Sequence, residues 1–244
     1  MILAIDCGNS RLKWGLHDAA GWIKTGALPL SKLASLESAW KSALRADKVV
    51  VANVAGPSVR KRLQAVFSRR SVRPIWVEAT RRGCGVTNGY AKAGQLGADR
   101  WAALIGAWSA VRGACLVVVA GTATTADVLR SDGTFAGGVI LPGLDLMKRS
   151  LAHDTAGLTL ARGHFSPTPR NTADAVETGC LIAQAGAIER AFAAMEPGAV
   201  CVLAGGAAAR IAPLLSIPVR LVDNLVLEGL VRIASEAPTK RETP

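Results

Sequence analysis

The spacing of apolar and polar residues near the N-terminus predicts three consecutive strands, over residues 2–6, 11–17 and 21–28. The first strand is an apolar run that ends at Asp6, and the second alternates apolar with basic positions. The small residues Gly8-Asn9-Ser10 between them are typical of a hairpin turn. We therefore expect a β-hairpin with a carboxylate at the end of its first strand.

Helical and strand-like patterns alternate through the rest of the first half. A helix is expected to begin at Ser31, whose hydroxyl is a good cap, and to place Leu33, Leu36 and Trp40 on one face. The expected elements are this helix to about Arg45, a strand over 48–53, a helix over 57–69, a strand over 73–77, a glycine-rich loop over 78–96 and a helix over 98–111.

The second half of the chain begins in the same way as the first. Its repetition of three meandering strands followed by helix and strand units predicts two α/β lobes, residues 1–112 and 113–244. Lobes that face each other would place both hairpin turns on one cleft, where α/β proteins favour ligands. The expected strands are 115–119, 123–129, 134–141, 200–203 and 219–222, and the expected helices are 144–152, 172–195, one after Gly205-Gly206, and 225–236.

The chain is basic, with 29 Lys and Arg residues against 18 Asp and Glu and a formal net charge of +11. Such a balance favours anionic partners: phosphorylated small molecules, nucleic acid or an anionic membrane. For the densest basic region we favour a solvated helix face and loop. It has no interleaved aromatic platform, which weakens a single-strand nucleic-acid interpretation. Its cations are Arg60, Lys61, Arg62, Arg69, Arg70, Arg73, Arg81 and Arg82.

Cysteine usage and hydropathy bear on the compartment. The five cysteines are scattered and form no C-x-x-C pair, which predicts neither a disulfide framework nor a zinc site and fits a cytoplasmic protein. The N-terminal apolar run lacks a preceding basic region and is interrupted by Asp6, so it is not typical of a signal peptide. The least charged stretch, residues 113–129, is too short and too polar to span a bilayer, so we expect no membrane partner.

Both hairpin turns have residues suited to binding phosphate. Amides of a small-residue turn cradle phosphate oxygens, and a carboxylate such as Asp6 holds Mg²⁺ directly or through water. An ordinary hairpin with a capping aspartate explains these residues equally well. The second turn, Gly121-Thr122, is followed by Thr124 and Thr125, whose hydroxyls add donors, although threonine also simply favours strands. Their equivalent places in two lobes strengthen the phosphate-binding interpretation of both turns.

Two further motifs admit a functional and a structural interpretation. In Gly97-Ala98-Asp99-Arg100, Asp99 falls in the first turn of a helix, where capping is the simpler explanation. The functional interpretation makes Asp99 a base for a substrate hydroxyl and Arg100 a forked ligand for a carboxylate or phosphate. Gly205-Gly206 either admits an adenine against the backbone or allows close packing of a helix on a strand.

Taken in order, these motifs resemble those of the type III pantothenate kinases, within the superfamily of sugar kinases, Hsc70 and actin. The resemblance covers nearly the whole chain, and the ordered set is far more specific than any one member. The matching residues are Asp6-x-Gly8-Asn9-Ser10, Tyr90, Gly97-Ala98-Asp99-Arg100, Gly121-Thr122-Ala123-Thr124-Thr125-x-Asp127, Gly137-Gly138-x-Ile140-x-Pro142-Gly143, Asn171-Thr172, Gly205-Gly206 and Asp223-x-Leu225-x-Leu227-Glu228-Gly229-Leu230.

The resemblance implies an α/β fold of two ribonuclease H-like lobes, with mixed sheets flanked by helices, as in actin-like ATPases. It also implies ATP-dependent phosphorylation of pantothenate, the first step of coenzyme A biosynthesis, by a homodimer. Asp99 would accept the hydroxyl proton, and Asp6 would hold Mg²⁺. ATP would be bound by Asp6, Cys7, Gly8, Asn9, Ser10, Arg11, Leu12, Lys13 and Thr122, and pantothenate by Tyr90, Gly97, Ala98, Asp99, Arg100 and Thr172.

One position departs from the pattern of the family. The family usually has an aspartate two residues before the glycine of the second turn, where it binds a monovalent cation, and this chain has Val119 there. Valine has no ligating side-chain oxygen. We therefore expect the K⁺ or NH₄⁺ site to be absent or built from backbone carbonyls, and activity to depend little on either ion.

Two other functions fit the same residues. One is a different small-molecule kinase of the superfamily, which profiling with pantothenate and sugars distinguishes from a pantothenate kinase. The other is a regulatory accessory factor or nucleic-acid-binding protein on the same fold, for which DNA binding with a steep salt dependence would be the sign. Intact phosphate turns and the Asp99 motif disfavour this second alternative.

Overall fold

The structure is a computed structural model that describes residues 1–35, 40, 46–69 and 72–237. Internal contacts divide the chain into two compact units, Met1–Ala110 with Leu225–Pro244, and Val111–Asn224. The predicted lobe boundary at 112/113 lies beside the end of the first stretch, whereas the segment from Leu225 groups with the first unit. The division into two lobes at 112/113 stays a prediction.

The first unit is built on a sheet of five strands in the order β3-β2-β1-β4-β5. Strands β1, β2 and β3 are antiparallel to their neighbours, as the N-terminal meander predicts, whereas β4 is parallel to β1 and β5 to β4. The strands are β1 (Ile2–Cys7), β2 (Arg11–Asp18), β3 (Gly21–Pro29), β4 (Lys48–Asn53) and β5 (Ile75–Trp76).

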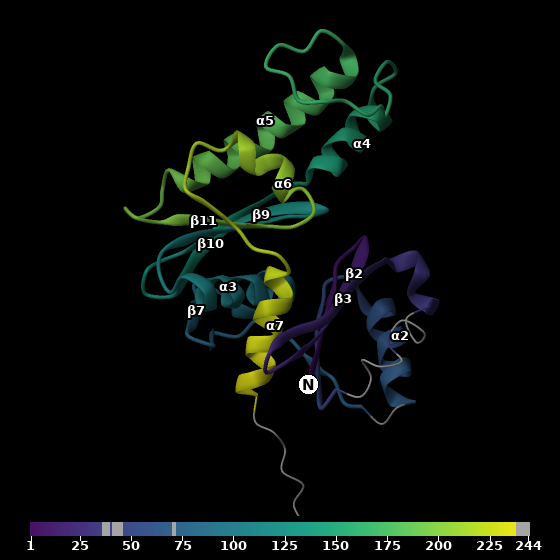
Figure 1. Cartoon of the computed structure of the whole chain (residues 1–244), viewed down its shortest axis with the longest axis vertical. Helices are drawn as coiled ribbons and strands as arrows, with labels where there is room; N and C mark the ends of the chain where they lie inside the picture. The colour runs from purple at the N-terminus through teal and green to yellow at the C-terminus, as the bar shows by residue number, and fades with distance from the viewer. Residues whose placement is uncertain (36–39, 41–45, 70–71, 238–244) are drawn as a thin grey trace, which may run out of the picture. The chain divides into compact units, whose positions relative to one another are not determined.

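Helix α2 (Pro57–Ser68) packs on this sheet, close to the predicted 57–69 (Figure 1). It buries Val59, Leu63 and Phe67, which recur at the four-residue spacing of one helix face. The ring of Trp40 stacks on Phe67 with centroids 6.0 Å apart, so this tryptophan is a core residue, as its predicted helix face requires.

The helix predicted from Ser31 is only partly described. A 3₁₀ helix, η1 (Leu30–Ser35), occupies its start, and Leu33 is buried as expected. Most of the remainder, residues 36–39 and 41–45, lies outside the described residues.

Helices α3 (Ala98–Val111) and α7 (Leu225–Glu236) of the first unit meet backbone to backbone. A Cβ atom at Gly229 would lie 1.8 Å from the carbonyl oxygen of Ala102, and one at Gly106 would lie 2.5 Å from that of Leu225. Glycine is required at both places because any side chain would enter the opposing backbone. Helix α7 also packs on β1 and β4, which encloses one face of the sheet (Figure 1).

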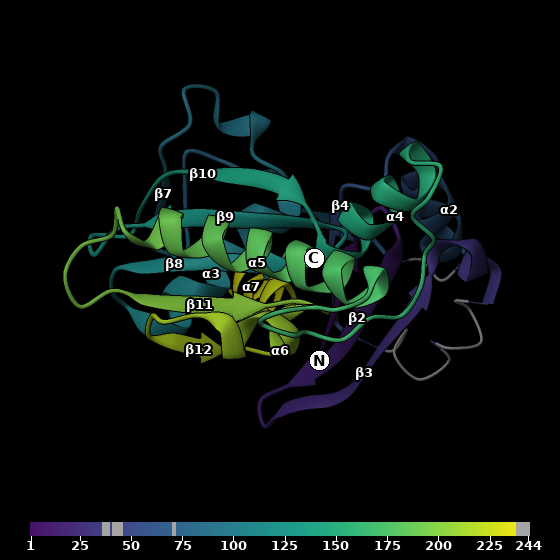
Figure 2. The same ribbon diagram turned by 90° about the horizontal axis from the view of Figure 1, so that it is seen from above.

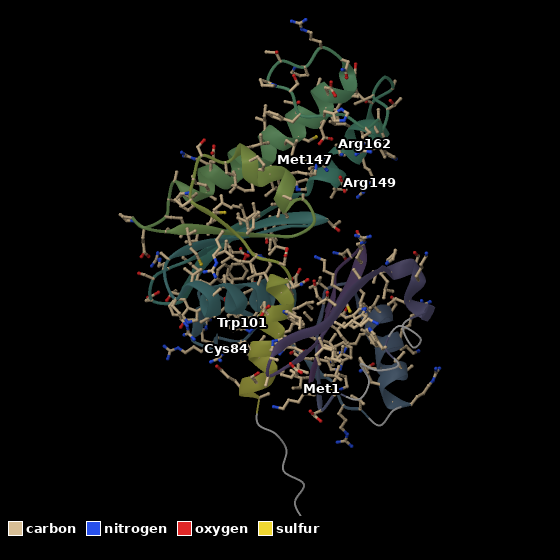
Figure 3. The ribbon with its side chains drawn as sticks, in the orientation of Figure 1. Met1, Cys84, Trp101, Met147, Arg149 and Arg162 are labelled. Atoms are coloured by element: carbon tan, nitrogen blue, oxygen red, sulfur yellow. The ribbon has the colours of Figure 1, made fainter. Side chains whose placement is uncertain are left out.

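The prediction of a glycine-rich loop over 78–96 is wrong in part, because the segment contains regular elements. The segment contains a short hairpin, β6 (Arg82–Gly83) and β7 (Val86–Asn88), and a 3₁₀ turn, η3 (Ala93–Gln95). Its two-residue turn has positive φ at both Cys84 (52°) and Gly85 (81°), the conformation that joins antiparallel strands tightly. The hairpin packs on Trp101, which Figure 3 labels together with Cys84. The strands are too short to produce an alternating pattern, so the clustered glycines were the only sign of tight turns in this segment.

The second unit repeats the strand arrangement of the first. Its strands follow the order β12-β11-β8-β9-β10, with β8, β9 and β10 antiparallel in sequence and β11 and β12 added in parallel. The first unit has the same order and the same directions. The strands are β8 (Cys115–Ala120), β9 (Ala123–Leu129), β10 (Thr134–Pro142), β11 (Val200–Ala204) and β12 (Val219–Leu221).

One face of the second sheet is covered by the long helix α5 (Thr172–Phe192), which lies along β8 and β9 (Figure 2). Beside it lie α4 (Leu144–Asp154) and the single turn α6 (Ala208–Ile211), which continues into η4 (Ala212–Leu214). Among the described residues, no helix has the length and apolarity needed to cross a bilayer.

Candidate active site

The turn between β1 and β2 is closed by its own backbone and presents polar residues to solvent. The amide of Gly8 donates to the carbonyl oxygen of Arg11 at 3.1 Å, and Asn9, Ser10 and Arg11 are exposed. By contrast, the side chains of Cys7 and Leu12 are fully buried in the core. Of the predicted ATP-binding residues, these two therefore offer only backbone groups.

Asp6 is the unusual residue of this hairpin. It lies directly opposite Lys13 in the β1–β2 register, and its Oδ1 is buried without a hydrogen-bond partner among the described residues. Burial and the negative charge of Asp99 raise the pKa of the Asp6 carboxyl to about 7, against the opposing effect of Lys13. The structure thus brings these three predicted site residues within electrostatic reach of one another.

An unpartnered, buried carboxylate oxygen fits a cation ligand. Within the described part of the chain, no cluster of three or more His, Cys, Asp or Glu side chains could form a complete metal site. Mg²⁺ commonly takes one or two carboxylates and completes its shell with water and substrate phosphates. Asp6 therefore fits Mg²⁺ bound together with a nucleotide, not a metal held by protein alone.

Asp99 occupies the first turn of α3, as predicted, and its position depends on Gly97. The backbone amide of Arg100 donates to Asp99 Oδ1 at 2.8 Å, and a Cβ atom at Gly97 would lie only 2.6 Å from that oxygen. The amide of Trp101 donates to the Gly97 carbonyl oxygen at 2.9 Å and opens the helix. The Gly-Ala-Asp-Arg spacing thus fixes the place of the carboxylate at the helix start.

Tyr90 and Arg100 form a second pair in the first unit. Arg100 Nη1 donates to the Tyr90 hydroxyl oxygen at 3.1 Å, and the guanidinium carbon lies 5.7 Å from the centroid of the ring. Arg100 is buried, so it keeps a permanent positive charge out of bulk water. The pair suits a small polar or anionic ligand group.

The loop that carries Tyr90 is held by two residues that the sequence analysis did not assign to the site. Arg81 donates to the carbonyl oxygens of Asn88, Tyr90 and Ala91 at 2.7, 2.9 and 3.0 Å. Buried Asn88 accepts from the Tyr90 amide at 3.0 Å and donates to the Ala93 carbonyl oxygen at 3.1 Å. The guanidinium of Arg81, counted among the solvated cations, is in fact a support for the loop.

In the second unit, the turn Gly121-Thr122 is supported from behind. The amide of Gly143 donates to the Thr122 carbonyl oxygen at 3.0 Å, and a Cβ atom at Gly143 would lie 2.1 Å from the Gly121 carbonyl oxygen. Two residues after Thr122, in β9, the hydroxyl of Thr124 donates to Gln184 Oε1 at 2.6 Å, and both side chains are fully buried. Thr124 is therefore a structural residue, whereas Gly121 and Thr122 are exposed.

Thr172, the remaining predicted site residue, is the exposed first residue of α5. The side chain of Asn171 caps this helix: its oxygen accepts from the Asp174 amide at 2.9 Å, and its nitrogen donates to Asp174 Oδ2 at 2.7 Å. The Asn171-Thr172 motif thus combines a helix cap with an exposed hydroxyl. Thr122 and Thr172 belong to the second unit, and the other predicted site residues to the first.

Comparison with known proteins identifies the family. A model of the type III pantothenate kinases matches residues 2–194. The type III pantothenate kinase of Aromatoleum aromaticum is 50% identical over 238 residues, which is 97% of this chain and 98% of that protein. The chain belongs to the type III pantothenate kinases. The family predicted from the ordered motifs is thereby confirmed.

Solved structures confirm the predicted fold of the pantothenate kinase. A Campylobacter jejuni protein, provisionally named a Baf family transcriptional activator, has a TM-score of 0.64 at 22% identity, with 96% of this chain and 98% of that chain covered. A Sinorhizobium meliloti protein, provisionally named 2-dehydro-3-deoxygalactonokinase, has a TM-score of 0.58 at 15% identity, with 96% and 97% covered. At these identities the likeness shows the fold alone, a mixed α/β architecture with two sheets flanked by helices.

Proposed function

We propose that this pantothenate kinase uses Asp99 as its base and its two hairpin turns as phosphate-binding elements. The reaction itself follows from the family: ATP phosphorylates pantothenate, the first step of coenzyme A biosynthesis. One observation supports the assignment of residues most strongly. The carboxylates of Asp6 and Asp99 interact electrostatically beside Lys13, and one Asp6 oxygen is buried with no partner among the described residues.

The nucleotide side of the site is assigned to the turns. Lys13 and the exposed turn residues Asn9 and Ser10 face the phosphates in this proposal, and Thr122 contributes from the second turn. Asp6 holds Mg²⁺, directly or through water, and that ion supplies neutralisation of the phosphate charge when bound. Phosphoryl transfer depends chiefly on positioning and on charge neutralisation, which is what these residues provide.

The acceptor side is assigned to the start of α3 and to Tyr90. Asp99 orients the primary hydroxyl of pantothenate and accepts its proton as the new O–P bond forms. Gly97 and Ala98 allow the substrate to approach this helix start closely. Buried Arg100, paired with Tyr90, binds the pantothenate carboxylate or a neighbouring polar group. Thr172, with its exposed hydroxyl at the start of α5, is assigned to pantothenate as well.

A coupled assay of ATP consumption, with and without pantothenate, tests the assignment. We expect Asp99→Asn to lower kcat by about 10²–10⁴-fold, the usual contribution of a positioned base. The affinity for ATP should change by no more than a few-fold. The exposed Asp154→Asn serves as a matched control and should behave like the wild type. A kcat for Asp99→Asn within a few-fold of the wild type would show that Asp99 is not the base.

The proposal includes a homodimer, for which the second unit offers a suitable surface. The solvent face of α5 carries no charge over Ala175, Gly179, Ile182, Ala183 and Gly186, and the side chain of Ile182 is 57% exposed. A long uncharged helix face suggests a contact with another chain. Light scattering should give a dimer for the wild type and a monomer for Ile182→Glu; a monomeric wild type would contradict the proposal.

Val119 bears on the monovalent cation. In the β8–β9 register it lies opposite Thr125, whose Oγ1 is buried without a hydrogen-bond partner among the described residues. The pair offers a neutral hydroxyl where the family usually has a carboxylate. We propose that no monovalent cation is held by a side chain at position 119. A cytoplasmic location likewise stays a proposal, based on five cysteines that form no disulfide.

A further inference from the structure

Three helices of the second unit meet at one buried carboxylate. Glu177 of α5 is only 3% exposed, and its two oxygens are bound by cations from two other helices. Lys148 Nζ of α4 lies 3.1 Å from Glu177 Oε2, and Arg210 Nη2 of α6 bonds to Glu177 Oε1. Asp145, at the exposed edge, lies 3.5 Å from Lys148 and 3.8 Å from Arg210. A buried carboxylate requires such partners, so the three helices are held together here.

Each of these helices begins next to a segment that the proposed function connects with the binding of ATP or pantothenate. Helix α4 follows Gly143, which supports the turn of Thr122, and α5 begins at Thr172. Helix α6 follows Gly205-Gly206, and the amide of Ala207, between this pair and the helix, donates to the carbonyl oxygen of Ala120 at 3.1 Å. Gly205 adopts φ +104°, and a Cβ atom there would lie 2.4 Å from the carbonyl oxygen of Ala120, the residue before the second turn. Gly205 is thus packed directly on the end of β8, whereas a Cβ atom at Gly206 would have no atom within 4 Å.

Helix α5 is fixed firmly to the rest of its unit. The amide of His164 donates to Asp174 at 2.8 Å, and that of Ser166 donates to the Thr178 hydroxyl at 3.0 Å. Further along the same helix, Gln184 donates to the carbonyl oxygen of Pro142 at 2.8 Å, and it also contacts Met147, which α4 turns toward α5 (Figure 3). The single turn α6 is attached to α5 by the burial of Ala208 and Ile211 in a shared core and by the ion pair of Arg210 with Glu177.

We propose that Glu177 is a positioning residue that couples the nucleotide segments to the start of α5, so that ATP and pantothenate bind cooperatively. This inference rests on the proposed roles of Thr122 and Thr172. A ligand that orders one of the three helix starts also orders the others through Arg210 and Lys148, and the second ligand then meets a site already arranged. Neither cation nor carboxylate needs to touch a reacting atom.

The test removes one ion pair and measures the coupling between the two ligands. Arg210→Met is the chosen variant because the Arg210 side chain is 42% exposed and Glu177 keeps Lys148 as a partner. Calorimetry gives the Kd of pantothenate with and without a non-hydrolysable ATP analogue and Mg²⁺. In the wild type we expect the analogue to tighten pantothenate binding by at least about fivefold, the lower range of allosteric coupling. In Arg210→Met, the ratio of the pantothenate Kd without the analogue to the Kd with it should fall below roughly twofold.

Two further variants make the result specific. Arg190→Met removes an exposed arginine from the last turn of α5, away from Glu177, and should keep the wild-type ratio. Arg210→Lys, which retains the charge, should restore most of the coupling. Thermal melts confirm that each variant is folded. If Arg210→Met does not fold, Lys148→Met replaces it, because that variant breaks the link to α4 and leaves Arg210 on Glu177.

The possible outcomes are distinct. A folded Arg210→Met with the wild-type ratio overturns the inference, and so does a wild type in which the nucleotide leaves pantothenate binding unchanged. A wild type that binds neither ligand contradicts the proposed site itself, and the inference with it. Glu177 is supported as the coupling residue if the analogue no longer tightens pantothenate binding in Arg210→Met but still does so in Arg190→Met.

Discussion

The two hairpins of this pantothenate kinase have one topology and different chemistry. Asp6 precedes the turn glycine of the first hairpin by two residues, and Val119 holds the same place before Gly121 in the second. Asp6 faces Lys13 across the strand pair, whereas Val119 faces Thr125. The repeated strand order therefore provides a turn at the same place in each sheet, over residues 8–10 in the first and 121–122 in the second, and the residue two positions before the turn glycine decides whether that turn carries charge.

Removing the carboxylate that distinguishes the first hairpin from the second is expected to have its largest effect on catalysis. Asp6→Asn removes the buried carboxylate while keeping its size, so we expect kcat/KM for Mg-ATP to fall by about 10²-fold or more, as for other lost electrostatic contacts to a reacting group. Asp18, half-buried at the far end of β2, provides the matched control Asp18→Asn. Steady-state kinetics at saturating pantothenate measure the loss, and a near-normal value would remove Asp6 from the nucleotide site.

Two helix glycines, one in each unit, differ in the room around them. Gly229 of the first unit has no room for a side chain, because a Cβ atom would lie 1.8 Å from the Ala102 carbonyl oxygen. We expect Gly229→Ala to lower the free energy of unfolding by about 3 kcal/mol or more, the upper range for overpacking. Gly186, on the exposed face of α5, has no atom within 4 Å of such a Cβ.

Gly186→Ala is therefore the control for Gly229→Ala. It should be neutral or raise stability by up to about 1 kcal/mol, the helix propensity that alanine gains over glycine. Urea unfolding of both variants measures the contrast. Equal effects of the two substitutions would mean that α3 and α7 do not meet at Gly229.

The raised pKa of Asp6 predicts a particular pH dependence of stability. Its folded pKa is about 7 against an ordinary value of 3.8, so between these values the folded state binds more protons than the unfolded state. The stability contributed by this group is fully present below pH 3.8 and is lost as the pH rises through about 7. Asp6→Asn should therefore gain roughly 2 kcal/mol relative to the wild type between pH 5 and pH 7, at about 1.4 kcal/mol for each unit.

Denaturation of both proteins in metal-free buffer at the two pH values measures this difference. Other titrating groups cancel, because only the change relative to the wild type is compared. A difference that is independent of pH would mean that the Asp6 carboxyl titrates normally in the folded protein.

The smallest effect is expected from monovalent cations. With Val119 in place, replacing K⁺ or NH₄⁺ by a large organic cation should change kcat by less than about twofold, since no carboxylate is available to hold the ion. Val119→Asp places a carboxylate at the position corresponding to Asp6 and should make activity depend on the cation. Strong activation of the wild type by either ion would contradict the proposal for this position.

The periodicity of apolar residues predicted most of the helices and strands, and the elements that it missed were missed for physical reasons. Strands such as β1 and β8 are long apolar runs ending at a glycine turn, so their positions follow from pattern alone. The β6–β7 hairpin was not predicted, because strands of two and three residues are too short to show an alternation of apolar and polar positions. Among the candidate site residues, the place of Asp99 in the first turn of α3 could be predicted from its motif. The support that Arg81 gives to Tyr90 could not, because it depends on backbone carbonyl groups that no side-chain pattern reveals.

The return of α7 to the first unit has a consequence for how the enzyme is made. Residues 111–224 form one continuous stretch, so the second unit can complete its contacts as soon as it leaves the ribosome. The first unit cannot, because Lys48 Nζ donates to the carbonyl oxygens of Ala234 and Ala237, at 2.9 and 3.0 Å, near the end of α7. The first unit, although its strands are synthesised first, therefore gains these contacts only after the whole of the second unit has been synthesised.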